Sequence, residues 1–280
     1  MPTSTDLRIE SFTKKGDASL NEDALIINEA LQVYGVVDGA TSLTPYRNQE
    51  GFTGGYIAGR LVASSFERMN QDLSLEQVVL EANKTLQEQM VTEGVDINDS
   101  AALWSAACVV IRIHPYSIEY IQAGDCMLLC QYKDGSVRVL THPQVAHVDQ
   151  KTLDRIAGLR NQGVVDPIEI RQHLMPFLQE NRKKTNTLEG YGVVNGSLSF
   201  PHFLEKGTFN RANLKSLYMV SDGLFTVLTS WSDLVASIDK QGLTGFAESI
   251  FKMEEADGEL LQFPRVKRSD DKTGIVLHFP

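Results

Sequence analysis

Residues 21–39 read NEDALIINEALQVYGVVDG, in which two short apolar segments are bounded by acidic residues. The segments 24–27 and 32–37 are rich in Val and Ile and are separated by polar residues, which predicts two paired β-strands. The second segment ends at Asp38-Gly39. Because a strand end holds a side chain rigidly, this stretch predicts a sheet that presents carboxylates at one end.

Two amphipathic helices are predicted to follow the strand pair. From Gly54 to Met69 apolar residues recur at intervals of three and four, which is the period of a helix with one buried face. Ser74 and Gln77 have the spacing of a capping box at the start of a second helix, and Gly94 can end that helix.

The middle of the chain is rich in strand signals. Four short apolar segments are bounded by turn residues, and Asp134-Gly135 between the last two is typical of a hairpin. We interpret the four segments as a β-meander. They cover residues 106–113, 118–122, 127–132 and 137–140.

The order of the predicted elements indicates the fold class. Runs of strands with paired helices before and after them, rather than strict alternation, predict an α+β layered sandwich. A strand at 217–220, helical segments to about Glu255 and a last strand at 274–279 complete it. No repeat or Gly/Ser linker divides the sequence, so we expect one domain over residues 1–280. The polar, helical segment 146–184 is the expected insertion or lid.

The composition argues against several classes of protein. The 36 acidic and 26 basic residues give a formal charge of −10, which repels nucleic acid and suits either a cation-binding protein or simply a well-solvated surface. No segment approaches the roughly 20 apolar residues that span a bilayer, and the N-terminus lacks the pattern of a secretory signal. We therefore expect a cytoplasmic protein without a membrane partner, in which Cys108, Cys126 and Cys130 are buried, reduced thiols.

Four acidic sites share one position relative to the predicted strands, because each lies at the end of an apolar segment or directly before one. Carboxylates that converge at strand ends repel one another unless cations lie between them, and hard oxygen ligands select Mg²⁺ or Mn²⁺ over Zn²⁺. A single Asp-Gly pair is also typical of a simple turn, as in the polar Asp134-Gly135, so the interpretation depends on the repetition. The four sites are Glu22-Asp23, Asp38-Gly39, Asp222-Gly223 and Asp270-Asp271.

Six short motifs occur in an order that resembles the protein phosphatase 2C family. None of the six is specific alone, but together they span nearly the whole chain. They are Asn21-Glu22-Asp23-Ala24, Val36-Val37-Asp38-Gly39, Ala123-Gly124-Asp125-Cys126, Gly190-Tyr191-Gly192-Val193, Val220-Ser221-Asp222-Gly223-Leu224 and Asp271-Lys272-Thr273.

The resemblance implies a four-layer αββα sandwich, in which a central antiparallel β-sandwich is flanked by helix pairs, with a flap at about 146–184. It also implies hydrolysis of phosphoserine or phosphothreonine in protein substrates, with two tightly bound Mn²⁺ or Mg²⁺ ions and a third, weaker one. The implied catalytic residues are Asp38, Asp125 and Asp222. The implied metal ligands are Glu22, Asp23, Asp38, Gly39, Asp125, Asp222 and Asp271, of which Asp38 bridges the two ions and Glu22 and Asp23 act through bound waters.

The sequence departs from the family pattern where the substrate is held and where a proton is supplied. Ala18 takes the place of an arginine that grips the phosphate, and Ala40 takes the place of a histidine that protonates the leaving alcohol. Lys14, Lys15 or Arg47 could supply the charge, and a metal-bound water, His142 or His147 could supply the proton, although a surface or structural role is open for each side chain. The remaining departures are Thr41-Ser42 after Ala40, Cys126-Met127 after Asp125, and Lys272 where an asparagine is expected.

Two functions remain to be compared. The carboxylates are all kept, which favours catalysis because mutually repelling acids are costly in a protein that binds no metal. The alternative is a non-catalytic pseudophosphatase that binds a partner or senses metal. The sequence indicates neither the substrate protein, nor the opposing kinase, nor the oligomeric state.

Overall fold

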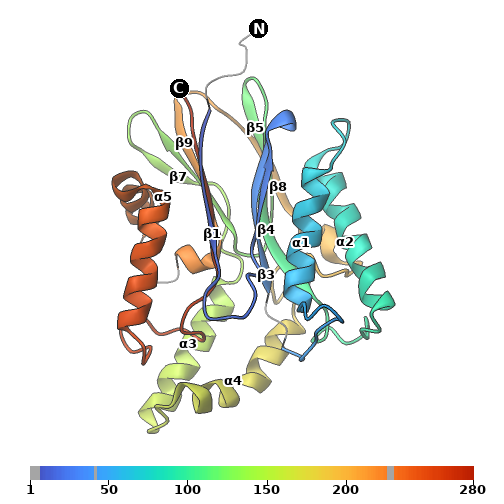
Figure 1. The fold of residues 1–280 in the computed structure, drawn as a ribbon, viewed down its shortest axis with the longest axis vertical. Helices are drawn as coiled ribbons and strands as arrows, with labels where there is room; N and C mark the ends of the chain where they lie inside the picture. Colours follow the sequence, from blue (N-terminus) through green and yellow to red (C-terminus); the bar gives the residue numbers. More distant parts are fainter. Residues whose placement is uncertain (1–6, 41–42, 226–229) are drawn as a thin grey trace.

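The computed structural model describes residues 7–40, 43–225 and 230–280 and contains two five-stranded antiparallel sheets (Figure 1). The first sheet has the order β2 (Ala24–Asn28), β3 (Val33–Ala40), β4 (Ser105–Ile113), β5 (Ser117–Ala123) and β8 (Glu205–Asn210). The second has the order β1 (Arg8–Lys14), β10 (Lys272–His278), β9 (Leu214–Val220), β6 (Met127–Tyr132) and β7 (Val137–Val139). Thr41-Ser42 and the first six residues, both used in the sequence analysis, lie outside the described part.

Helices cover the outer face of each sheet, which confirms the predicted α+β, four-layer architecture. The helices α1 (Gly54–Glu67) and α2 (Leu75–Thr92) lie against the first sheet, and α5 (Trp231–Ala256) lies against the second (Figure 1). Gly242 has a φ of 71° and divides α5 into two helical segments, so this layer also contains a pair. No helix in residues 7–40, 43–225 and 230–280 is long and apolar enough to cross a membrane.

Three hydrophobic clusters fill the spaces between these layers. Val36, Val109 and Met219 belong to the cluster between the two sheets, where the side chains of both inner faces are fully buried. The predicted helix periodicity is accounted for by a second cluster, which joins Phe66 and Leu86 to the first sheet. Burial at about 25 cal/mol per Å² of apolar surface makes these clusters the main source of stability, and they hold the strand ends rigidly.

The predicted β-meander is wrong. Although β4 pairs with β5 and β6 pairs with β7, the two pairs belong to different sheets, and β6 pairs with β9 instead of β5. The chain crosses between the sheets at Gly124-Asp125-Cys126, where Gly124 has a φ of 80° that favours glycine. The strands β1 and β8 were not predicted, because both lie at sheet edges and alternate little between apolar and polar residues.

The segment predicted as a lid forms a pair of contacting helices, joined by a turn, at one end of the sandwich (Figure 1). They are α3 (Ala146–Asn161) and α4 (Pro167–Arg182), with Gly163 in the turn between them at a φ of 92°. Ile156, Ile170 and Leu174 form a small hydrophobic cluster of their own. The pair therefore carries its own core in addition to the three clusters of the sandwich.

Candidate metal centre

Five aspartates approach one another at the end of the sandwich nearer α3, and we call Asp23, Asp38, Asp125, Asp222 and Asp270 the acidic centre. They come from both sheets. Asp38 is near the end of β3, Asp125 lies in the crossing between the sheets, and Asp222 begins a short 3-10 helix, η3 (Asp222–Leu224), directly after β9. The cross-sheet fold thus gathers side chains that are up to 247 positions apart.

The charges of this centre act strongly on Asp38. Burial raises the pKa of the Asp38 carboxyl well above its ordinary value, and the negative charges of Asp23, Asp222, Asp270 and Asp125 raise it further. Like charges disfavour one another's ionisation only when they are close. The charges of all four other members of the acidic centre thus reach Asp38.

Asp222 is the second strongly perturbed carboxyl. Burial and then the charge of Asp270 raise its pKa to about 6, while Lys267 and a hydrogen bond with Asp38 act in the opposite direction. Asp125 behaves similarly, because burial and the charges of Asp222 and Asp149 raise its pKa well above the ordinary value. These two carboxylates and Asp38 thus share one electrostatic environment.

Asp149 was not predicted from the sequence. It lies on the first turn of α3, in the segment interpreted as a lid, and the residue itself is exposed. Desolvation of the Asp149 carboxyl by the surrounding protein, and then the charge of Asp222, raise its pKa to about 7. Only the packing of α3 beside the centre reveals this side chain, since its surroundings in sequence resemble any solvated helix face.

Glu22 and Asp23 are held inside the protein directly before β2. Asp23 is 1% exposed and accepts a hydrogen bond of 2.8 Å from Ser221 Oγ, while burial, and then the neighbouring acids, raise its pKa well above the ordinary value. Glu22 accepts a hydrogen bond from the hydroxyl of Thr53, which is also the N-cap of α1. Both carboxylates therefore have protein partners, which agrees with an indirect role toward a cation.

Gly39 is required by close backbone packing beside Asp38. A Cβ at Gly39 would lie 2.3 Å from the carbonyl oxygen of Gly55 and 2.6 Å from that of Glu22. No side chain fits at such distances, so the end of β3 can meet the first turn of α1 only through glycine. The packing fixes the backbone that carries Asp38, and it leaves the Gly39 carbonyl as a candidate ligand.

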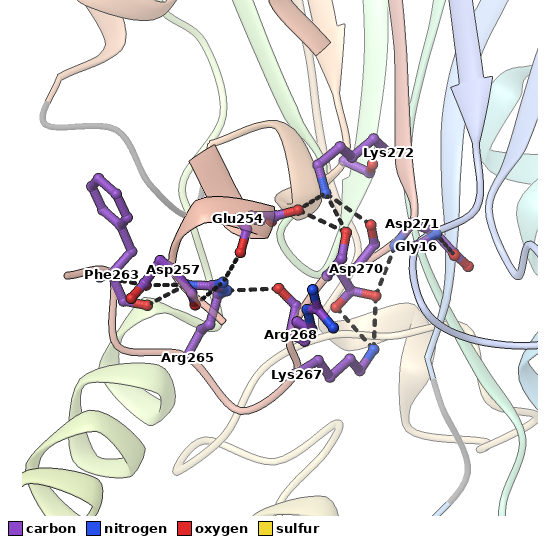
Figure 2. Close-up of polar contacts among 12 residues, drawn as sticks. Gly16, Glu254, Asp257, Phe263, Arg265, Lys267, Arg268, Asp270, Asp271 and Lys272 are labelled. Atoms are coloured by element: carbon purple, nitrogen blue, oxygen red, sulfur yellow. Dashed lines mark hydrogen bonds and ion pairs between the residues drawn. The ribbon is translucent and has the colours of Figure 1, made fainter. Parts of the chain in front are cut away.

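Asp270 and Asp271 have different surroundings although they are adjacent (Figure 2). Both oxygens of Asp271 accept backbone N–H groups, from Gly16 at 2.8 Å and from Glu22 at 2.7 Å. Among the acidic centre its charge acts on Asp23, whereas that of Asp270 acts on Asp23, Asp38, Asp125 and Asp222. Successive side chains of an extended segment point to opposite sides, so only one of the two can face the centre.

Two buried ion pairs support the loop that carries Asp270 (Figure 2). Lys272, which takes the place of the expected asparagine, is fully buried, and its Nζ lies 2.8 Å from Glu254 Oε2 and 3.0 Å from the Asp270 carbonyl oxygen. Arg265 lies 2.7 Å from Asp257 and is 6% exposed. Because both pairs are also hydrogen-bonded to backbone, they define the path of the loop.

The basic residues considered as replacements for the missing arginine are separated in the structure. The Lys14 ammonium lies over the ring of Phe251 at 4.9 Å. Arg47 donates a hydrogen bond of 3.0 Å to the hydroxyl of Ser19, the residue next to Ala18. Of these two, Arg47 therefore reaches the position where the family arginine is missing.

His142 and His147 line a surface cleft of about 340 Å³. None of the five aspartates of the acidic centre lines it. Tyr191 and Gln144 also line the cleft, and the charges of Asp125 and Asp149 act on Tyr191. Gln144 accepts a hydrogen bond of 2.9 Å from the backbone of Gly192, which lies in one of the six motifs. The cleft is therefore linked to the acidic centre only through the charges that act on Tyr191.

The donor set fits Mn²⁺ or Mg²⁺ by its chemistry. Every member of the acidic centre is a hard carboxylate, and burial and then mutual repulsion, which a divalent cation would relieve, raise the pKa values of Asp38, Asp125 and Asp222. Within residues 7–40, 43–225 and 230–280, no group of three or more His, Cys, Asp or Glu side chains is placed so that it could hold a metal ion. The residues therefore suit the metals in chemistry and charge, and binding would require their side chains to move closer together.

A known protein family resembles this chain in sequence, and solved structures resemble it in fold. The family model for protein phosphatase 2C matches residues 14–260. No curated protein matches the sequence.

Solved structures are similar over nearly the whole chain. PppA, a regulatory component of the type VI secretion system in Pseudomonas aeruginosa, is 15% identical, with a TM-score of 0.60 and 98% of both chains covered. The serine/threonine phosphatase PstP/Ppp of Mycobacterium tuberculosis is 17% identical, with a TM-score of 0.59 and 98% of both chains covered. The catalytic domain of PstP in complex with two manganese ions is 16% identical, with a TM-score of 0.57 and 97% of both chains covered. At these identities the likeness shows the fold.

Proposed function

Because the chain belongs to the protein phosphatase 2C family, we propose that it is a metal-dependent phosphatase that hydrolyses phosphoserine or phosphothreonine in cytoplasmic proteins. The observation that carries this proposal is the acidic centre, where five aspartates from both sheets perturb one another's ionisation. The family relation supports a phosphoprotein as the substrate. The proposal also includes that residues 1–280 form one domain and that residues 146–184 act as a lid.

The family relation, together with the charges that the acids exert on one another, supports an assignment of the residues that would hold Mn²⁺ or Mg²⁺. Asp38 would bridge two cations, with Asp222 on one side, the Gly39 carbonyl on the other, and Glu22 and Asp23 acting through water. Asp125, joined here by Asp149, would hold a third, weaker ion. When bound, such ions acidify a water for attack on phosphorus and offset charge on the phosphoryl oxygens.

We assign to Asp270 the ligand role that the motif order assigned to Asp271. The Asp271 carboxylate already accepts two backbone N–H groups, whereas the Asp270 charge reaches the whole centre. Asp271 then stands where the family has asparagine, and its oxygens accept hydrogen bonds as an amide oxygen would. Compared with the motif order in the sequence analysis, the ligand position moves from Asp271 to Asp270 and the asparagine position moves from Lys272 to Asp271.

The protein groups around the substrate would position it and exclude water. Arg47 beside Ser19 would supply a guanidinium for the phosphate, and a planar guanidinium holds two oxygens at once. The cleft lined by His142 and His147 would receive the peptide next to the phosphorylated residue. Either histidine would then be a candidate to protonate the leaving alkoxide.

The second candidate function is a pseudophosphatase that binds a partner without catalysis. The specific observation in its favour is the absence of both the family arginine, at Ala18, and the family histidine, at Ala40. Under this hypothesis the carboxylates would serve metal sensing or structure alone.

Hydrolysis of an aryl phosphate separates the two functions, because a phenolate leaves readily without a general acid. We expect hydrolysis that requires Mn²⁺ or Mg²⁺, stops with chelator and returns on adding metal. Lys240→Ala, which changes an exposed lysine of α5, is a control that should behave like the wild type. The absence of hydrolysis with either metal, in a folded protein, would favour the pseudophosphatase.

A further inference from the structure

Lys267 places a positive charge at the acidic centre, in the same loop as Asp270. Its Nζ lies 2.8 Å from Oδ1 and 2.8 Å from Oδ2 of Asp270, so both oxygens of that carboxylate are engaged (Figure 2). The charges of Asp222 and Asp38 also act on the ammonium. Lys267 was not singled out in the sequence, because a lysine in an exposed loop is ordinarily a solvated one.

An exposed ion pair three residues apart is ordinarily of little consequence, worth about 0–1 kcal/mol. Two features distinguish this pair. Its carboxylate partner acts on Asp38, Asp222, Asp125 and Asp23, and the loop that carries it is held by the buried pairs of Lys272 with Glu254 and Arg265 with Asp257. The position of the ammonium beside the centre is therefore built into the loop.

We propose that the Lys267 ammonium is a tethered cation that competes with one divalent ion for Asp270, so that the two metal positions of this chain differ in affinity. The proposal rests on the proposed metal centre and refines the expectation of two tightly bound ions. The ion shared by Asp38, Asp222 and Asp270 must displace the ammonium, whereas the ion on the Gly39 side of Asp38 need not. Lys267 thereby also offsets the repulsion among the acids.

Lys267→Gln tests this inference, with Arg268→Gln as the matched control. Both changes remove one positive charge from neighbouring positions, but Arg268 is exposed and its side chain does not pair with Asp270. Lys267→Arg keeps the charge. Mn²⁺ titration calorimetry on the three variants and the wild type gives the number and affinity of bound ions without reference to activity.

We expect the affinity of the weaker Mn²⁺ site of the wild type to rise at least about tenfold in Lys267→Gln. The repulsion between a unit positive charge and a divalent ion about 5 Å away corresponds to a change in affinity of about that size even in water. Arg268→Gln and Lys267→Arg should stay within about threefold of the wild type. Without metal, Lys267→Gln should melt below Arg268→Gln, and saturating Mn²⁺ should close the gap.

The outcomes separate this inference from the proposed function. If the wild type hydrolyses an aryl phosphate with Mn²⁺ but Lys267→Gln and Arg268→Gln have the same Mn²⁺ affinities, the tethered cation is wrong and the phosphatase stands. An equal gain in Mn²⁺ affinity in both variants would also overturn the inference, because it would show that removing any nearby positive charge has the same effect. No Mn²⁺ binding by any of the proteins would overturn both.

Discussion

The backbone N–H of Glu22 donates a hydrogen bond of 2.7 Å to Oδ2 of Asp271, although the two residues are 249 positions apart. With the bond from Gly16 to the other oxygen, this contact ties the start of β10 to the acidic turn before β2. The same contact engages the Asp271 carboxylate and so favours Asp270 as the proposed metal ligand, which leads to the first prediction.

Asp271→Ala should lower the free energy of unfolding by about 3 kcal/mol, because two buried N–H groups lose a charged acceptor. Asp270→Asn should change stability by less than about 1 kcal/mol but weaken Mn²⁺ binding. Urea unfolding and calorimetry measure the two effects. An Asp271→Ala protein of normal stability that no longer binds Mn²⁺ would return the ligand role to Asp271.

Asp38→Asn should abolish Mn²⁺ binding and activity together, because the removed charge lies among all four other members of the centre. Two cations would then face each other with too little compensation. Calorimetry checks the stoichiometry. Two Mn²⁺ ions still bound would show that Asp38 is not the bridging ligand.

Asp125→Ala should leave the two ions at Asp38 bound and still reduce turnover on the order of 10²-fold, the scale of one lost electrostatic stabiliser or general acid. Phosphopeptides should suffer more than aryl phosphates, whose leaving group scarcely needs a proton. Asp149→Asn should show the same bias, since both charges act at one place. Full activity of Asp125→Ala on phosphopeptides would show that Asp125 serves the turn and has no role in catalysis.

Without metal, the protein should lose stability as the pH rises from 3.8 to about 6, because the Asp222 carboxyl binds its proton more tightly when folded than when unfolded. Asp222→Asn imitates the protonated carboxyl, so at pH 7 it should be about 1–2 kcal/mol more stable than the metal-free wild type, after allowance for its partial exposure. Urea unfolding across this pH range measures the difference. If the metal-free wild type were more stable than Asp222→Asn at pH 7, the inference that the ionised Asp222 carboxylate destabilises the fold would be contradicted.

Replacing residues 150–181 by a short Gly/Ser linker keeps Asp149 but removes most of α3 and α4. Because this pair of helices has its own core, the sandwich should still melt cooperatively. Discrimination among phosphopeptides should change far more than hydrolysis of an aryl phosphate. Loss of both activities in a folded protein would exclude a selectivity role for the lid.

The local elements were largely predictable because they depend on neighbours in sequence. The capping box of Ser74 and Gln77 is present, and the strand at 127–132 has the predicted bounds. Periodicity does not say which sheet a strand joins, so the crossing at Gly124 was mistaken for a continuous meander. The edge strand β8, with the polar sequence EKGTFN, gave no apolar signal.

The site was predictable only as a group of acids at strand ends. The choice between Asp270 and Asp271 depends on the backbone of Gly16 and Glu22, which the pairing of β1 with β10 brings into place. Asp149 and Lys267 reach the centre through the packing of a helix and a loop. Those contacts have no counterpart in local sequence.

The tie between Glu22 and Asp271 has a consequence for the protein during its synthesis. The segment directly before β10 supplies both the clamp on the N-terminal turn and the neighbouring Asp270, and it is held in place when β10 pairs with β1, so a ribosome-bound chain that lacks β10 has an incomplete centre. Long-range pairing of this kind also forms late, because distant segments must meet first. Enzymatic competence should therefore begin only when β10 leaves the exit tunnel, and unfinished chains should be harmless to phosphoproteins near the ribosome.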